Sequence, residues 1–147
     1  MTIRDQIQSD TRTAMKQRDR IRVAALRMVG AALKNAEIEA GRPLTEQEEQ
    51  TILRRQLKQR DESAEAFRKA GREEQAASES AEAEIVRTYL PEPLSQKELE
   101  EIVNRAIDET GAKGMRDMGA VMALAMDLSE GRAEGRALSA LARARLQ

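Results

Sequence analysis

The sequence contains no histidine, no cysteine and no tryptophan among its 147 residues. Without histidine, the chain lacks the commonest general base and a frequent metal ligand. Without cysteine, it can form neither disulfides nor thiolate metal sites, and cysteine usage does not fix its compartment. These two absences exclude most of the side-chain sets that carry nucleophilic or metal-assisted catalysis.

Aromatic residues are almost absent too, since one tyrosine and one phenylalanine make up 1% of the chain. Strands favour aromatic side chains, and proteins that bind single-stranded nucleic acid use them as stacking platforms. No apolar run approaches the ~20 residues that span a bilayer. Asp5, Gln6, Ser9 and Asp10 interrupt any signal-peptide core near the N-terminus. We therefore expect a cytoplasmic protein that does not bind a membrane.

The residues that are abundant, chiefly Ala, Arg, Glu, Leu and Gln, favour helices. Capping boxes at Thr45–Glu48 and Ser95–Glu98 start two of them. Between these boxes, Pro91 and Pro93 interrupt the chain. The sequence predicts an all-α protein with a four-helix bundle in residues 1–90 and a three-helix domain in residues 95–147.

Apolar periodicity predicts where most of the helices begin and end. The predicted helices of the first bundle cover about residues 3–16, 20–40, 45–70 and 73–90. The inner face predicted for the fourth consists of Ala77, Ala81, Ile85 and Tyr89. Its exposed side is strongly acidic, whereas residues 1–36 carry eight basic and three acidic side chains, a net charge of +5.

Three glycines shape the C-terminal stretch. Gly119 lies in a helix, where glycine costs about 1 kcal/mol relative to alanine. We expect close approach of another backbone to compensate. Gly131 follows the last periodic apolar residue, Leu128, where a left-handed cap favours glycine. Gly135 is predicted to open the last helix, which buries Leu138.

This stretch, with Gly119, Met122, Gly131-Arg-Ala-Glu-Gly135 and Ser139, resembles the C-terminal signature of the GatB/YqeY family. Leu26-Arg27, Ala32-Leu-Lys34, Lys58-Gln-Arg60, Phe67, Ala70-Gly-Arg72 and Tyr89-Leu-Pro91 extend the resemblance over nearly the whole chain. The match is to the free-standing, YqeY-like member. Related domains form the tail of the B subunit of glutamine-dependent tRNA amidotransferases, which are carbon–nitrogen ligases. The family usually has aspartate where this chain has Glu134, and glutamate is not a favoured N-cap.

The resemblance implies a non-catalytic accessory module of translation that contacts tRNA, because the tail of the amidotransferase is implicated in that contact. The candidate tRNA-binding residues are Arg132 in the glycine-rich turn, Arg136 and Arg143 on one face of the last helix, and Lys113 and Arg116, which flank the start of the preceding helix. No cofactor, metal ion or small-molecule substrate is expected. We expect no activity from the chain alone, because no amide-hydrolysing or ATP-binding motif is present.

A secondary basic stripe consists of Arg20, Arg27 and Lys34, which recur every seven residues on one helix face. The stripe is either a solvated face or a track for phosphates. Any RNA site must be local, because the whole chain has a net charge of −1. Residues 91–147 carry eight basic and ten acidic side chains, a net of −2.

Two functions stay open on the sequence. One is the tRNA-binding module, with a possible protein partner in aminoacyl-tRNA metabolism. The other is a protein–protein interaction adapter that makes no contact with RNA. Salt-dependent binding of tRNA by the purified chain would distinguish the two.

Overall fold

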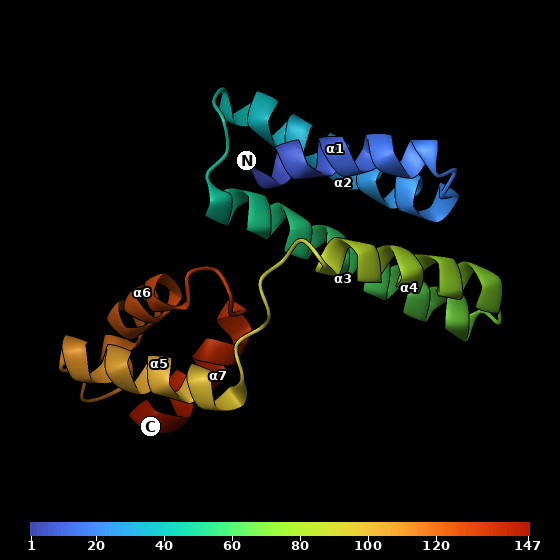
Figure 1. The fold of residues 1–147 in the computed structure, drawn as a ribbon. Helices are drawn as coiled ribbons and strands as arrows, with labels where there is room; N and C mark the ends of the chain where they lie inside the picture. The colour runs from blue at the N-terminus through green and yellow to red at the C-terminus, as the bar shows by residue number, and fades with distance from the viewer. The chain divides into compact units, whose positions relative to one another are not determined.

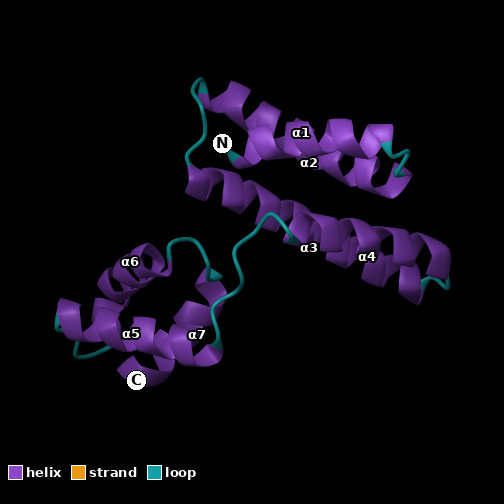
Figure 2. Cartoon of the chain, in the orientation of Figure 1, coloured by secondary structure: helices purple, strands orange, loops and turns teal.

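The computed structural model describes all residues, 1–147, and it is entirely helical apart from turns and loops (Figures 1 and 2). The helices are α1 (Ile3–Lys16), α2 (Arg20–Ala40), α3 (Glu46–Lys69), α4 (Glu73–Arg87), α5 (Gln96–Thr110), α6 (Met118–Ser129) and α7 (Gly135–Leu146), with a 3₁₀ turn, η1 (Met115–Asp117), before α6. The all-α prediction, with four helices followed by three, is confirmed.

The chain divides into two compact units, Met1–Leu90 and Pro91–Gln147. In the first unit, α1 packs on α2 and α3 packs on α4, and α2 also contacts both α3 and α4. In the second unit, each of α5, α6 and α7 packs on the other two. Helix α2 therefore joins the two helical pairs of the first unit.

The core of the first unit forms where apolar side chains from all four helices meet. Ile7 of α1, Leu26 and Leu33 of α2, Leu53 of α3 and Val86 of α4 are all buried in one cluster. Burying a side chain of this size contributes about 1.5–3 kcal/mol relative to leaving it exposed. The cluster fixes α1 against α2, so the outward side chains of these two helices keep fixed relative positions.

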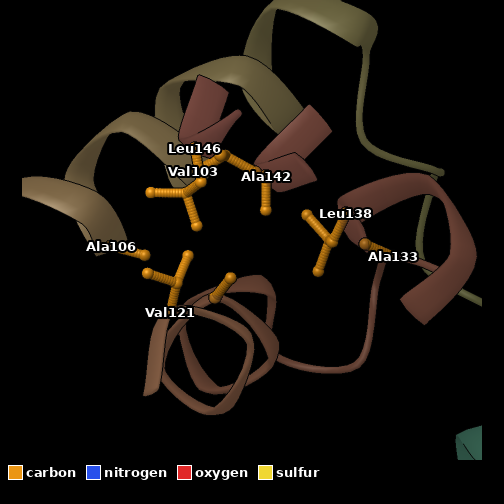
Figure 3. Close-up of a cluster of buried hydrophobic side chains, with 8 residues drawn as sticks. Val103, Ala106, Val121, Ala133, Leu138, Ala142 and Leu146 are labelled. Carbon is orange, nitrogen blue, oxygen red and sulfur yellow. The ribbon is translucent and has the colours of Figure 1, made fainter. Parts of the chain in front are cut away.

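The second unit has its own core, which Figure 3 shows in close-up. Val103 of α5, Val121 of α6 and Leu138 of α7 are fully buried, and Ala106, Ala133, Ala142 and Leu146 surround them. The small alanines let the three short helices approach closely. Leu138 is buried, as the sequence predicts, so the opposite side of α7 faces solvent.

Most helix starts agree with the sequence. The Thr45 and Ser95 capping boxes are both present, with Thr45 Oγ1 accepting from Glu48 N at 3.2 Å and Ser95 Oγ accepting from Glu98 N at 3.1 Å. Asp19 caps α2, because its carboxylate accepts from Arg22 N at 3.1 Å. These caps satisfy amide donors that the first helical turn leaves unpaired.

The prediction for the fourth helix is wrong in its end and partly wrong in its inner face. Helix α4 ends at Arg87, and the chain reaches Leu90 through turns. Its buried residues are Ala76, Ala83 and Val86, whereas Ala77 is exposed. The helix contains mostly alanine and glutamate, so its apolar periodicity is weak. Its contacts with both α3 and α2 then decide which side is buried.

Candidate nucleic-acid interface

Arg132, the first of the predicted tRNA-binding residues, makes an internal contact in the second unit. Its guanidinium donates two hydrogen bonds to the backbone carbonyl of Glu92, from Nε at 3.2 Å and from Nη2 at 3.1 Å. The side chain thereby ties the α6–α7 turn to the segment that precedes α5. Glu130 and Glu134 flank Arg132 in the sequence. Part of its hydrogen-bonding capacity is therefore already used within the fold.

Arg136 and Arg143 both lie on α7 and are both exposed. Seven residues correspond to about 10.5 Å along a helix axis and to nearly two full turns. The two guanidinium groups therefore project from one side of α7, away from buried Leu138. Neither makes an ion pair.

Lys113 lies just before η1 and Arg116 lies within it; both are exposed, at the opposite end of α6 from Arg132. Helix α6 has 12 residues, which makes it about 18 Å long. The Lys113 backbone amide donates to the Asp117 carboxylate at 2.9 Å, and this bond lowers the pKa of Asp117. The five predicted residues thus do not gather at one point, and carboxylates lie among them.

The three glycines differ in what they do. Gly131 has the left-handed φ of 75° that the sequence predicts, directly after Glu130, which is also left-handed at 52°. Gly135 opens α7, and a Cβ there would meet only Met126 Sδ at 3.9 Å. The close approach predicted at Gly119 is absent, because no atom lies within 4 Å of the Cβ position. Gly119 is exposed in the first turn of α6, with open space where a Cβ would lie.

The secondary stripe has a different setting in the first unit. Arg20, Arg27 and Lys34 are all exposed on α2. The steps of seven residues place them about 10.5 Å apart along the axis, over about 21 Å in total. Because α1 is packed on α2, residues of α1 extend this surface sideways.

Two open grooves follow this side of the α1–α2 pair, and we call them together the α1–α2 basic groove. One is lined by Met15, Arg18, Arg20, Val23, Ala24 and Arg27, and the other by Arg4, Ile7, Gln8, Thr11, Arg12, Leu26, Arg27, Gly30, Ala31 and Lys34. Arg27 lines both, so the two grooves are neighbours. No acidic residue lines either of them.

Most of the basic side chains in this groove have no acidic partner. Arg4 is paired with Glu37, but no ion pair involves Arg12, Arg18, Arg20, Arg27 or Lys34. Arg27 Nη2 lies 3.6 Å from the sulfur of Met15, a neutral acceptor. Five positive charges are therefore available to an external anion.

Arg12 and Arg18 belong to this surface as well, although the sequence pattern does not indicate them. Arg12 lies on a different helix from the stripe, and only the packing of α1 on α2 brings it to the same groove. Arg18 lies in the turn between the two helices with a left-handed φ of 58°. That conformation costs a non-glycine residue roughly 1–2 kcal/mol. Glycine would be the favoured residue there, yet the chain has an arginine.

Other parts of the first unit carry the compensating negative charge. A groove beside α3 and α4 includes Asp61 and Glu65 together with two basic residues, and one between α2 and α3 includes Glu39 and Glu48. The two grooves of the basic surface differ from these because their lining is free of carboxylates. An anionic ligand would therefore meet the least repulsion at the α1–α2 basic groove.

No group of three or more histidine, cysteine, aspartate or glutamate side chains could hold a metal ion. No helix is both long enough and apolar enough to cross a bilayer.

The structure defines an all-α protein of two small helical units, with grooves on the first helical pair that are lined by basic and no acidic residues. Residues 4–146 match the model of the family described as Yqey-like protein, and the chain belongs to this family. This confirms the family resemblance inferred from the sequence.

The chain is also similar in sequence to a curated protein. The altered inheritance of mitochondria protein 41, mitochondrial, of Pyrenophora tritici-repentis (strain Pt-1C-BFP) is 28% identical over 129 residues, which cover 86% of this chain and 71% of that protein. Its name assigns that relative to mitochondria. The cytoplasmic location expected for this chain therefore stays a prediction.

Proposed function

We propose that this protein is a non-catalytic RNA-binding accessory module, and that its RNA is tRNA. The observation that carries the proposal is the α1–α2 basic groove, where Arg12, Arg18, Arg20, Arg27 and Lys34 have no acidic partner. The choice of tRNA rests on the family's resemblance to the tail of the tRNA amidotransferase subunit.

Contacts with phosphate explain how such a groove would bind. Each lysine or arginine that neutralises a phosphate releases a condensed counterion, which favours binding and makes it weaken with salt. Contacts of this kind position an RNA without reading its sequence. Because the whole chain has a net charge of −1, we expect modest affinity confined to this surface.

The second unit is expected to contribute less to RNA binding than the α1–α2 basic groove. Arg136 and Arg143 are exposed and could contact a second stretch of the same RNA. Arg132 contributes less, since its guanidinium is held by the Glu92 carbonyl. This order differs from the sequence-based expectation, which put the arginines near the glycine-rich turn first.

The test is binding of labelled bulk tRNA by the purified full chain at about 50 mM and about 200 mM salt. The triple variant Arg20→Glu, Arg27→Glu, Lys34→Glu should lose binding, whereas Arg136→Glu with Arg143→Glu should weaken it less. Melting curves of both variants should match the parent, because exposed substitutions usually change stability by less than about 0.5 kcal/mol. Absence of tRNA binding by the parent at the lower salt would refute the proposal.

The adapter function has one observation in its favour. The groove between Arg18 and Arg27 has an apolar floor made by Met15, Val23 and Ala24, and Met15 is 49% exposed. An apolar floor with a basic rim also suits a protein segment that carries acidic side chains. A pull-down from extract, with and without RNase treatment, separates the two. Partners that persist after RNase treatment, together with no binding of purified tRNA, would favour the adapter.

A further inference from the structure

We infer that the α1–α2 basic groove binds double-helical RNA, along the phosphates of a helical arm, and not single-stranded RNA. This inference rests on the proposed function and specifies its ligand. It is carried by two features of the same surface: basic residues that project from a well-packed pair of helices, and the lack of any aromatic side chain among them.

The first feature is the rigidity of the charged track. Arg20, Arg27 and Lys34 lie along one helix of 21 residues, with steps of about 10.5 Å. Buried Leu26 and Leu33 of the same helix, and Ile7 of α1, hold the backbone in place. A stiff duplex presents its phosphates at fixed spacing, so it can match such a track without first being ordered. A flexible single strand would lose conformational freedom in doing so.

The second feature is the absence of a stacking surface. No aromatic residue lines either part of the groove. Phe67 is half-buried on α3, and the half-buried Tyr89 uses its hydroxyl to donate to Asp10. Stacking contributes about 1–3 kcal/mol per base in proteins that bind single strands. This surface cannot supply that contribution.

The floor of the groove also suits the surface of an A-form helix. Gly30 and Ala31 are small, and Gln8 and Thr11 lie beside them. The exposed Gln8 amide can donate to or accept from a ribose 2′-hydroxyl. Proteins recognise double-stranded RNA largely by its shape and by contacts to phosphates and 2′-hydroxyls. No side chain in the groove needs to reach a base edge.

Counterion release gives an estimate of how much more tightly the groove should bind a duplex than a single strand. If Arg12, Arg18, Arg20, Arg27 and Lys34 each neutralise one phosphate, log affinity falls against log salt with a slope of about −4.5 on a duplex. The corresponding slope on a single strand is about −3.5. If the duplex and the single strand bind equally at about 1 M salt, this slope difference of about 1 favours the duplex about tenfold at about 0.1 M salt.

The experiment measures binding of three RNAs to the full chain at about 0.1 M salt. These are two duplexes of about 20 base pairs with unrelated sequences, and one unstructured single strand of matching length. We expect equal affinities for the two duplexes and about tenfold weaker binding of the single strand. The variant Arg27→Glu with Lys34→Glu should lose duplex binding. The matched control, Arg55→Glu with Lys58→Glu, changes two exposed α3 residues outside the groove and should keep it.

The outcomes separate this inference from the proposed function. Equal or tighter binding of the single strand would overturn the duplex inference and leave RNA binding intact. Strong preference for one duplex sequence would overturn it as well, because base readout would then be required. If none of the RNAs binds and bulk tRNA does not bind either, both proposals fail together.

Discussion

The hydroxyl of Tyr89 donates a hydrogen bond to the carboxylate of Asp10, so the turn after α4 is attached to α1 although 79 residues separate the two. Burial and this bond to Asp10 raise the pKa of Tyr89 above its usual value of about 10. We expect Tyr89→Phe to lower the free energy of unfolding by about 1.5 kcal/mol, because one hydrogen bond to a carboxylate is lost. Thermal melts at neutral pH measure this.

The same bond predicts a response to alkaline pH. A phenol whose pKa is raised in the folded state stabilises the fold below the unfolded pKa, and that contribution is lost as pH rises above about 10. Tyr89→Phe should therefore lose less stability than the parent above that pH. Identical alkaline melting profiles for Tyr89→Phe and the parent would contradict this explanation.

Arg60 of α3 is placed between two carboxylates of α4. Its Nε lies 3.5 Å from Glu79 Oε2 and its Nη1 lies 3.9 Å from Glu82 Oε2, with all three side chains at most 20% exposed. Burial, then repulsion from Glu79, raises the pKa of Glu82. Two carboxylates thus share one guanidinium, and Arg60 Nε, Glu79 Oε2 and Glu82 Oε2 form no hydrogen bond.

Because two carboxylates share one guanidinium, substitutions of Arg60 and Glu82 should affect stability differently. Arg60→Met should destabilise the first unit by about 2 kcal/mol, less than the 3–5 kcal/mol of a fully buried pair, because both carboxylates lose their partner. Glu82→Gln should be neutral or stabilising at pH 7, since a group with a raised acidic pKa destabilises the fold once it is ionised. Urea unfolding of the two variants measures both changes. A large loss of stability in Glu82→Gln would show that the carboxylate is needed.

The hydrogen bonds of Glu48 should make the stability of the first unit sensitive to acid. Hydrogen bonds from Arg42, and then from the Thr45 backbone and side chain, lower the pKa of Glu48 from 4.5 to about 2. Its contribution to stability is therefore present above pH 4.5 and is lost as the pH falls toward 2. Glu48→Gln should flatten that part of the stability curve. The comparison of acid melts with an Arg42→Gln variant separates the contribution of the ion pair from that of the cap.

The N-terminus of α7 can be improved. Glu134 is its N-cap residue but makes no capping hydrogen bond. Aspartate has the shorter side chain that reaches the amides of the first turn, so Glu134→Asp should stabilise the second unit by about 1 kcal/mol. Calorimetry checks this, with Glu134→Gln as the control for charge. No gain from aspartate would mean that the turn does not present those amides to the cap.

The sequence predicts those parts of the fold that depend on neighbouring residues. Thr45 and Ser95 act within three residues of themselves, and each caps the helix it was predicted to cap. The buried face of α4 depends on packing against α2 and α3, and its alanines carry little directional information. The prediction therefore placed Ala77 on the inner face, whereas the neighbouring Ala76 is the buried residue.

The residues of the candidate site also fall into two groups, those visible in the local sequence pattern and those brought together only by packing. The spacing of Arg20, Arg27 and Lys34 is visible in the sequence because they share one helix. The place of Arg12 beside them depends on how α1 packs on α2. The contact of Arg132 with the Glu92 carbonyl joins residues 40 positions apart, and no local pattern indicates it. Composition alone suggests an exposed charge there.

At position 18 the left-handed backbone favours glycine, whereas the basic groove requires a positive charge. Arg18→Gly would relieve the turn and remove one of the charges that line the groove. Selection of random variants for heat resistance should therefore enrich glycine at position 18. Selection of the same library for retention on a polyanion should remove it.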